Sequence, residues 1–176
     1  MYLVYALTRR RAKSLQEVIT YYLEMKSEKE LKGVEESNGL SVIEAEIDNY
    51  KLNKFLYQYV GEPWDWVDKL SLSDESWQRY VENPGLRTWV AYYKGSIAGY
   101  FELSVVGSDI ELVYFGLAQA FIGKGFGGYL LSFAIKQAWG IDGAKRVWLH
   151  TCSLDHPNAL KNYEARGFKL YKTETT

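Results

Sequence analysis

The chain has 176 residues, of which 47% are hydrophobic and 24% are charged, so it is long enough to bury a core without crosslinks or a metal. A formal net charge of −1 excludes the strongly basic character of most nucleic-acid-binding proteins. No repeat or flexible linker divides the sequence. We therefore expect a single domain over residues 1–176, best defined over 86–171 and least defined over 1–47, with no nucleic-acid partner.

The N-terminal segment does not resemble a secretory signal, because the basic run Arg9–Arg11 follows the apolar stretch Met1–Thr8 instead of preceding it. The basic run itself is typical of a solvated surface. No apolar run reaches the roughly 20 residues of a membrane span. Cys152 is the only cysteine, which excludes an internal disulfide. We expect a cytoplasmic protein with no membrane partner.

The first third of the chain gives mixed signals. Val18–Met25 is compatible with a strand or a helical turn, and a polar loop bounded by glycines follows over Gly33–Gly39. Asp48 is a candidate N-cap for a helix over Asn49–Val60, which Gly61 would end.

The central part of the chain gives clearer signals for helices and strands. Ser73 predicts the N-cap of a second helix, which Asn83-Pro84-Gly85 would stop. Three β-rich runs joined by tight turns then predict an antiparallel meander: Leu86–Tyr93, Ser96–Val105 and Ile110–Leu117.

The last third alternates helices and strands. The expected elements are a helix over 124–139, a strand over Arg146–Cys152, a helix opened by Pro157 and ended by Gly167, and a strand over Phe168–Tyr171. A strand, a helix and a strand in succession imply a parallel pair with a right-handed crossover. The expected fold class is α/β (α+β), a mixed and mostly antiparallel sheet flanked by helices.

A glycine-rich stretch lies between the third strand of the meander and the helix that follows it. Four glycines fall within six residues, at Gly123, Gly125, Gly127 and Gly128. Glycines let the backbone turn its N–H groups toward a ligand at a helix start, which suits a pyrophosphate. A flexible connection is the less favoured alternative, because so many glycines at the start of a helix would destabilise the helix without serving a function.

The same stretch matches the dinucleotide fingerprint G-x-G-x-x-G, with Asp142 at about the right distance. A nucleotide-dependent oxidoreductase is therefore an alternative. It is disfavoured, because the match follows an antiparallel meander and leaves too few residues for the usual βαβ units.

A second motif lies downstream. Ala159 and Tyr163 are four residues apart and share a helix face, and Gly167-Phe168 returns the chain to the sheet. A tyrosine on such an inward stripe is usually part of the core.

Together the two motifs resemble the GNAT superfamily of acetyl-CoA-dependent N-acetyltransferases. The coenzyme loop of that family, Arg/Gln-x-x-Gly-x-Gly/Ala, corresponds to Ile122–Gly127, and the pattern Asn-x-x-x-x-Tyr-x-x-x-Gly-Phe begins at Asn158. The resemblance is firm from Leu86 to Tyr171. Three segments are also similar to a bacterial GNAT subgroup with no settled substrate: Pro63–Asp68, Glu111–Leu117 and His150–Phe168.

The resemblance implies a GNAT fold and transfer of the acetyl group of acetyl-CoA to a primary amine of a small molecule or peptide. A non-catalytic acyl-CoA-binding or sensory module with the same fold is the alternative. A homodimer would be compatible with either function.

The resemblance also implies a set of coenzyme-binding residues: Phe115, Leu117, Ile122, Gly123, Lys124, Gly125, Phe126, Gly127, Gly128 and Asn158. Ile122 stands where the family usually has Arg or Gln, which removes one side-chain contact to the pyrophosphate. We expect this change to weaken coenzyme A binding without abolishing it, because the backbone N–H groups remain and Lys124 adds charge.

For catalysis, the resemblance places Tyr163 near the coenzyme sulfur as general acid. Glu111 is the candidate general base, although an exposed structural role or a water chain in its place is equally compatible with the sequence. Strict alternation along the strand would put Glu111, Val113 and Phe115 on one face, opposite Leu112 and Tyr114.

The chain is rich in aromatic residues, with 6 Trp and 15 Tyr. Tyr57, Trp64 and Trp66 lie where GNAT folds flank the acceptor groove, and their rings could receive an ammonium group. Core packing is the better interpretation for at least half of the aromatic cluster. Nearby acidic side chains, Glu62, Asp65 and Asp68, would favour a cationic acceptor.

Two histidines and one cysteine cluster near the C-terminal strands. His150 and Cys152 would share a face of their strand, with His156 beyond it. No fourth ligand is evident, so we expect no metal site.

Overall fold

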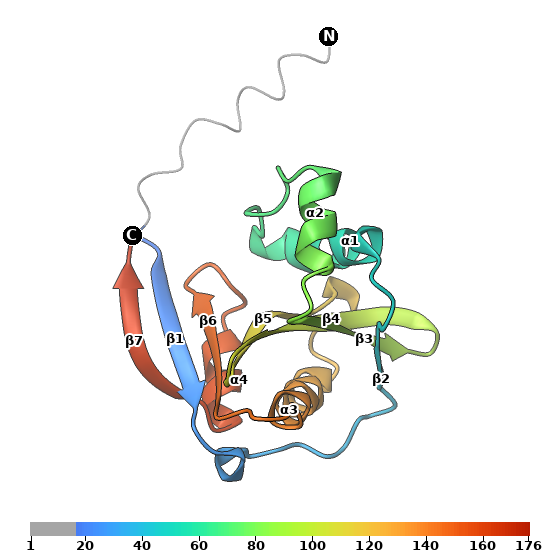
Figure 1. Ribbon diagram of the computed structural model, residues 1–176. Coiled ribbons are helices and arrows are strands. Elements are labelled where there is room, and N and C mark those ends of the chain that lie inside the picture. The colour runs from blue at the N-terminus through green and yellow to red at the C-terminus, as the bar shows by residue number, and fades with distance from the viewer. Residues whose placement is uncertain (1–16) are drawn as a thin grey trace.

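Seven strands form one mixed sheet in the computed structural model, which describes residues 17–176 (Figure 1). The segments Met1–Thr8 and Arg9–Arg11 lie outside the described residues. The strands are β1 (Ile19–Met25), β2 (Ser41–Glu44), β3 (Leu86–Tyr93), β4 (Ser96–Val106), β5 (Asp109–Leu117), β6 (Arg146–Cys152) and β7 (Lys169–Thr175). The helices are α1 (Tyr50–Gly61), α2 (Asp74–Val81), α3 (Phe126–Trp139) and α4 (Ala159–Ala165), with short 3-10 turns at Glu28–Glu30, Glu62–Trp64 and Gln119–Phe121.

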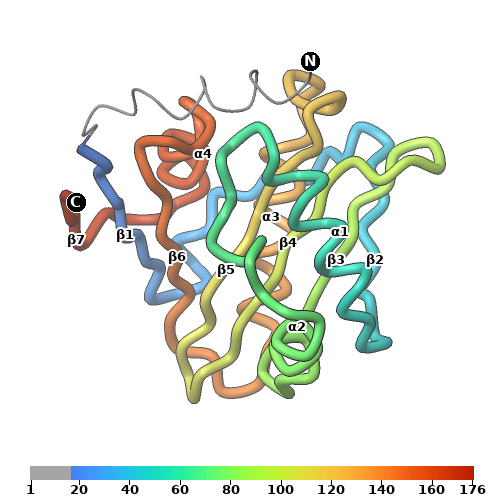
Figure 2. The backbone as a smooth tube through the Cα atoms, turned by 90° about the horizontal axis from the view of Figure 1, so that it is seen from above, coloured from blue at the N-terminus to red at the C-terminus, as the bar shows by residue number. Residues whose placement is uncertain are grey.

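The strand order is β2-β3-β4-β5-β6-β1-β7, and Figure 2 shows it from β2 on the right to β7 on the left. Every neighbouring pair is antiparallel except β5 and β6, which are parallel and joined through α3. This arrangement confirms the predicted fold class. It also excludes the doubly wound parallel sheet that the dinucleotide alternative requires.

Three predicted helix starts are wrong by one or two residues; the helix expected from residue 124 begins at Phe126, after the N-cap Gly125. The N-cap of α1 is Asn49 and not Asp48, because the Asn49 side chain accepts hydrogen bonds from the N–H groups of Lys51 and Leu52. The last helix begins at Ala159, two residues after Pro157.

The segment that was ambiguous in sequence, 18–25, forms the strand β1, which lies between β6 and β7. It pairs antiparallel with both neighbours. Leu23 and Met25 are completely buried in the main core. β1 therefore joins the C-terminal strand to the rest of the sheet.

The helices cover the two faces of the sheet separately. In Figure 1, α1 and α2 lie over one face, and α3 and α4 lie over the other. The main core lies between α3 and the sheet, and α3 contributes Leu130 and Leu131 to it. A smaller core lies between α1 and the other face, and α1 contributes Leu56 and Val60 to it. Among the helices within residues 17–176, none combines the length and hydrophobicity that crossing a bilayer requires.

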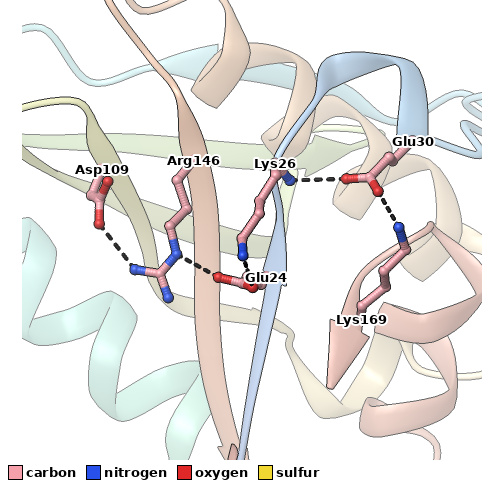
Figure 3. A network of polar contacts seen from close by, with 6 residues as sticks. All are labelled: Glu24, Lys26, Glu30, Asp109, Arg146 and Lys169. Atoms are coloured by element: carbon pink, nitrogen blue, oxygen red, sulfur yellow. Dashed lines mark hydrogen bonds and ion pairs between the residues drawn. The ribbon is translucent and has the colours of Figure 1, made fainter. Parts of the chain in front are cut away.

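A network of charged side chains connects β1 to its neighbouring strands (Figure 3). Arg146 of β6 donates to Glu24 of β1 at 2.7 Å and to Asp109 of β5 at 2.9 Å. Glu30 accepts from the Lys26 backbone N–H at 2.9 Å and from the Lys169 ammonium group. The network thus joins β5, β6, β1 and β7.

A β-bulge in β5 changes which side chains face which layer. Glu102 pairs with Tyr114 and Leu103 pairs with Leu112, so Val113 has no opposing residue on β4. Tyr114 packs with the smaller core on the α1 side, and Phe115 packs with the main core on the α3 side. The strict alternation predicted for this strand is therefore wrong at Tyr114 and Phe115.

Candidate active site

The two parallel strands separate soon after they meet. β5 and β6 pair only from Asp109 with Arg146 to Glu111 with Trp148. Beyond this point β5 stays paired with β4, and β6 stays paired with β1. The edge of β5 that faces β6 therefore has no strand partner from Leu112 onward within the described part of the chain. Its main-chain groups are available to a ligand.

A cleft of about 840 Å³ occupies this separation. Such a volume lies toward the upper end of the range of small-molecule sites. The lining comes from Leu112–Leu117 of β5, from the glycine loop, from residues 64–69 between α1 and α2, and from residues 150–163 around α4. Trp64 and His156 are in edge contact, with ring centroids 5.0 Å apart, so two of these walls touch each other.

The glycine loop forms the α3 end of the cleft. Gly123 and Gly125 have φ angles of 79° and 82°, in the left-handed region that favours glycine. A Cβ atom at Gly123 would meet nothing within 4 Å. Gly125 is the N-cap of α3 and provides no side-chain cap, so the first N–H groups of this helix have no side-chain partner. The exposed backbone N–H groups and the positive end of the helix dipole at this point are suited to binding a diphosphate.

Most of the residues expected to hold a coenzyme line this cleft: Phe115, Leu117, Ile122, Gly123, Gly125, Phe126, Gly127, Gly128 and Asn158. Lys124 is not among the described lining residues. Its ammonium group lies 5.2 Å from the centre of the Phe121 ring.

Tyr163 lines the same part of the cleft from α4. Its side chain is 7% exposed, and its ring packs against Phe115 and Phe168. Burial raises the pKa of the Tyr163 hydroxyl, with a smaller contribution from the charge of Asp155. The hydroxyl therefore stays protonated throughout the neutral pH range.

The opposite wall is aromatic and acidic. Trp66 packs against Tyr114, and both line the cleft. The carboxylate of Asp68 accepts hydrogen bonds from Tyr57 at 2.5 Å and from Tyr114 at 2.7 Å. Partial burial alone would raise the pKa of Asp68, but these two hydroxyls hold it below its ordinary value. Asp68 is therefore ionised at neutral pH.

The three aromatic residues expected in the acceptor groove separate into two groups. Trp64 and Trp66 line the cleft. Tyr57 is 1% exposed and is not among the lining residues; it lies behind them, packed against Trp66 and hydrogen-bonded to Asp68.

Glu111 lies at the last paired position of β5 and β6 and is not among the lining residues. One of its carboxylate oxygens is 3.4 Å from Nδ1 of His150, which does line the cleft. Cys152 and His156 line it as well. Within residues 17–176, no group of three or more His, Cys, Asp or Glu side chains is placed to hold a metal ion.

Sequence reasoning did not single out two polar positions of the cleft. Asn162 lies one helical turn after Asn158, and its amide nitrogen is 3.7 Å from the place a Cβ would take on Gly127. Asp155 accepts from the Thr151 hydroxyl at 2.5 Å and from the Cys152 N–H at 2.9 Å. The four-residue spacing to Asn158 could have revealed Asn162, whereas nothing local indicates that Asp155 folds back onto its own strand.

Comparison with known proteins agrees with this geometry. The sequence model of the Acetyltransferase (GNAT) family matches residues 53–168. No curated protein matches the chain. Its fold is similar to that of a GCN5-related N-acetyltransferase from Sphaerobacter thermophilus, with a TM-score of 0.68, 13% identity, and coverage of 90% of this chain and 50% of that one.

Two further solved structures are similar. For a GCN5-related N-acetyltransferase from Kribbella flavida the TM-score is 0.63 at 15% identity, over 97% of this chain and 61% of that one. For an IAA acetyltransferase from Bacillus cereus ATCC 14579 the TM-score is 0.54 at 24% identity, over 75% of this chain and 79% of that one. At these identities the likeness is one of fold. The chain spans between half and two thirds of the length of the Sphaerobacter and Kribbella proteins.

Proposed function

Because the chain belongs to the GNAT family of acetyltransferases, we propose that it transfers the acetyl group of acetyl-CoA to a primary amine of a small molecule or peptide. Members of this family use an acyl-CoA donor and acetylate amine acceptors. One observation carries the proposal for this chain: the cleft between β5 and β6 ends at the uncapped, glycine-lined start of α3.

The donor end of the cleft would be the glycine loop. The N–H groups of Gly123–Gly128 are suited to the diphosphate of coenzyme A, and Asn158 borders the same space. The backbone of Phe115 and Leu117, on the unpaired edge of β5, would hold the acetyl and pantetheine parts. Ile122 can offer no hydrogen bond from its side chain, so we expect coenzyme A to bind more weakly than it does where Arg or Gln is present.

Acetyl-CoA supplies a thioester carbonyl carbon and a thiolate leaving group. Tyr163 would act as the general acid for that thiolate, because its protonated hydroxyl belongs to the donor side of the cleft. The carboxylate nominated as base, Glu111, belongs to the other face of the sheet, together with His150. Acid and base would thus act from opposite sides of the reacting carbon.

The acceptor would enter along the wall that contains Trp64, Trp66 and Asp68. An ionised Asp68 and the faces of the tryptophan rings favour a cationic amine. Tyr57 would act indirectly, by holding the carboxylate of Asp68 in place.

A matched pair of glycine variants tests the donor site. Gly123 and Gly143 have nearly equal positive φ angles, 79° and 78°, and a Cβ atom at either one would meet nothing within 4 Å. Alanine costs about 1–2 kcal/mol of backbone strain at each. Only Gly123 borders the cleft. We expect Gly123→Ala to weaken acetyl-CoA binding by about 10- to 100-fold, the value of one or two hydrogen bonds to a charged group, whereas Gly143→Ala binds normally.

Binding is measured by calorimetry, and turnover is measured as thiol release from acetyl-CoA with polyamines, amino acids and lysine peptides. Equal binding by the two variants would remove the glycine loop from the donor site. Tight acetyl-CoA binding with no thiol release for any amine would favour the non-catalytic acyl-CoA-binding module.

A further inference from the structure

The side chains of Glu111 and His150 contact each other at the place where the cleft begins. Oε1 of Glu111 lies 3.4 Å from Nδ1 of His150. Glu111 occupies the last register position shared by β5 and β6, and His150 follows two residues after its register partner Trp148. Each of the two residues is therefore held by a strand that keeps its outer neighbour, β4 or β1.

The two residues differ in their access to the cleft. The His150 side chain lines it and is 47% exposed, whereas the Glu111 side chain is 21% exposed and lies behind the histidine. The rings of Tyr22 and Trp148 flank the imidazole, with centroids 5.9 and 6.3 Å away. Across residues 17–176, Glu111 is the one carboxylate within 4 Å of this imidazole. With Nδ1 toward the carboxylate, Nε2 is the nitrogen left for a ligand.

Three other titratable side chains of the cleft, Asp68, Asp155 and His156, already have hydrogen-bond partners. Asp68 receives two tyrosine hydroxyls, and Asp155 receives a hydroxyl and a backbone N–H. Nδ1 of His156 accepts the Asn158 N–H at 3.0 Å, so a neutral His156 has its proton on Nε2 and offers no acceptor there.

We propose that His150 is the catalytic residue that accepts the amine proton, and that Glu111 is the positioning residue that fixes its tautomer. The inference rests on the proposed acetyl transfer. The amine nitrogen bonds to the acetyl carbon while the carbon–sulfur bond breaks. One N–H proton passes to Nε2 of His150, and the sulfur takes the Tyr163 hydroxyl proton. Both side chains then return to their starting states by exchanging protons with solvent.

The charges around His150 support this role. Glu111 faces it from β5, Tyr22 from β1, Asp155 from the β6–α4 loop and Asp68 from the α1–α2 connection. The contact with Glu111 is the largest cause of a raised His150 pKa, and burial opposes it. A base must be unprotonated to act, so activity should rise with pH through this pKa. A histidine titrates near the working pH, as an efficient general base requires.

The test is the pH profile of kcat/KM for the wild type, Glu111→Gln and His150→Gln, using the best amine of the panel above. The neutral amide introduced by Glu111→Gln lacks the charge that raises the His150 pKa, so the acid limb of this variant should remain but move to lower pH. In His150→Gln, kcat should fall by about 10²- to 10⁴-fold and this limb should disappear. The acetyl-CoA affinity of both variants should stay normal, which shows that the cleft is folded.

A control replaces the other cleft histidine. His156→Gln should keep the midpoint of the wild-type acid limb. Loss of the limb in Glu111→Gln, with rate and limb kept in His150→Gln, would make Glu111 itself the base and overturn the inference. Normal profiles in both variants would overturn it while leaving acetyl transfer intact. A wild type that binds acetyl-CoA but acetylates no amine would overturn the proposed function, and the inference with it.

Discussion

Tyr163 shows how a single buried residue can stay chemically available. Its ring packs between Phe115 and Phe168, which accounts for its place in the core, and it also lines the cleft. Its pKa is raised above the ordinary value near 10, chiefly by burial. Such a hydroxyl keeps its proton at neutral pH, so it is present as a donor when the thiolate of coenzyme A forms beside it.

We predict that Tyr163→Phe lowers kcat by about 10²- to 10⁴-fold, because the sulfur loses its proton donor while the ring packing remains. Acetyl-CoA affinity, measured by calorimetry, should change little. Tyr50→Phe is the control: the Tyr50 hydroxyl donates to Asp74 on the surface and is not part of the cleft lining, so its turnover should match the wild type. Unchanged turnover in Tyr163→Phe would remove this residue from the mechanism.

At the scale of elements, α1 and α2 are fastened to the sheet by a buried carboxyl group. Asn53 of α1 donates to Glu102 and to Thr88, both at 2.8 Å, and Tyr80 of α2 donates to the other oxygen of Glu102. Burial raises the pKa of Glu102, and the donated hydrogen bonds only partly oppose it. The helices that form one wall of the cleft thus depend on a group that resists ionisation.

This arrangement predicts a particular pH dependence of stability. A carboxyl group whose pKa is raised on folding stabilises the protein fully below its unfolded value, about 4.3, and this stabilisation is lost as pH rises through the folded pKa. The amide side chain introduced by Glu102→Gln does not ionise. The melting temperature of this variant, relative to the wild type at each pH, should therefore rise as pH increases from about 4.5 toward neutrality. A difference independent of pH would contradict the prediction.

The same scale shows how far local patterns can predict structure. Apolar periodicity, turn residues and capping residues predicted most of the helices and strands, because those signals act within a few residues. The bulge at Val113 has no such local signal, since it depends on how β4 pairs with β5. Strict alternation therefore misplaced Phe115. It grouped this residue with Glu111, whereas Phe115 packs in the core that contains Tyr163.

At the scale of the molecule, the glycine loop and the strand–helix–strand unit could be predicted from sequence, because each is continuous in the chain. The position of β1 between β6 and β7 could not be predicted from the sequence. An alternating pattern indicates burial, but it carries no information about which distant strand lies alongside. The same limit applies to His150, whose partnership with Glu111 depends on the β5–β6 register.

Because β1 separates β6 from β7, its packing should matter to the stability of the whole sheet. Leu23→Ala, at a completely buried position, should lower the free energy of unfolding by about 2–5 kcal/mol in denaturant titrations. Leu170→Ala on β7, where the side chain is 46% exposed, is the control and should cost well under half as much. Equal costs would mean that β1 contributes no more than an edge strand.

The position of β1 also has a consequence for synthesis of the chain. Side chains of β1 bond to partners 122 and 152 residues further along, on β6 and β7. As the polypeptide leaves the ribosome, β1 must wait, unpaired and carrying Leu23 and Met25, until the residues of β6 and β7 have been translated. High contact order of this kind slows folding and exposes an apolar strand to chaperones and to other nascent chains.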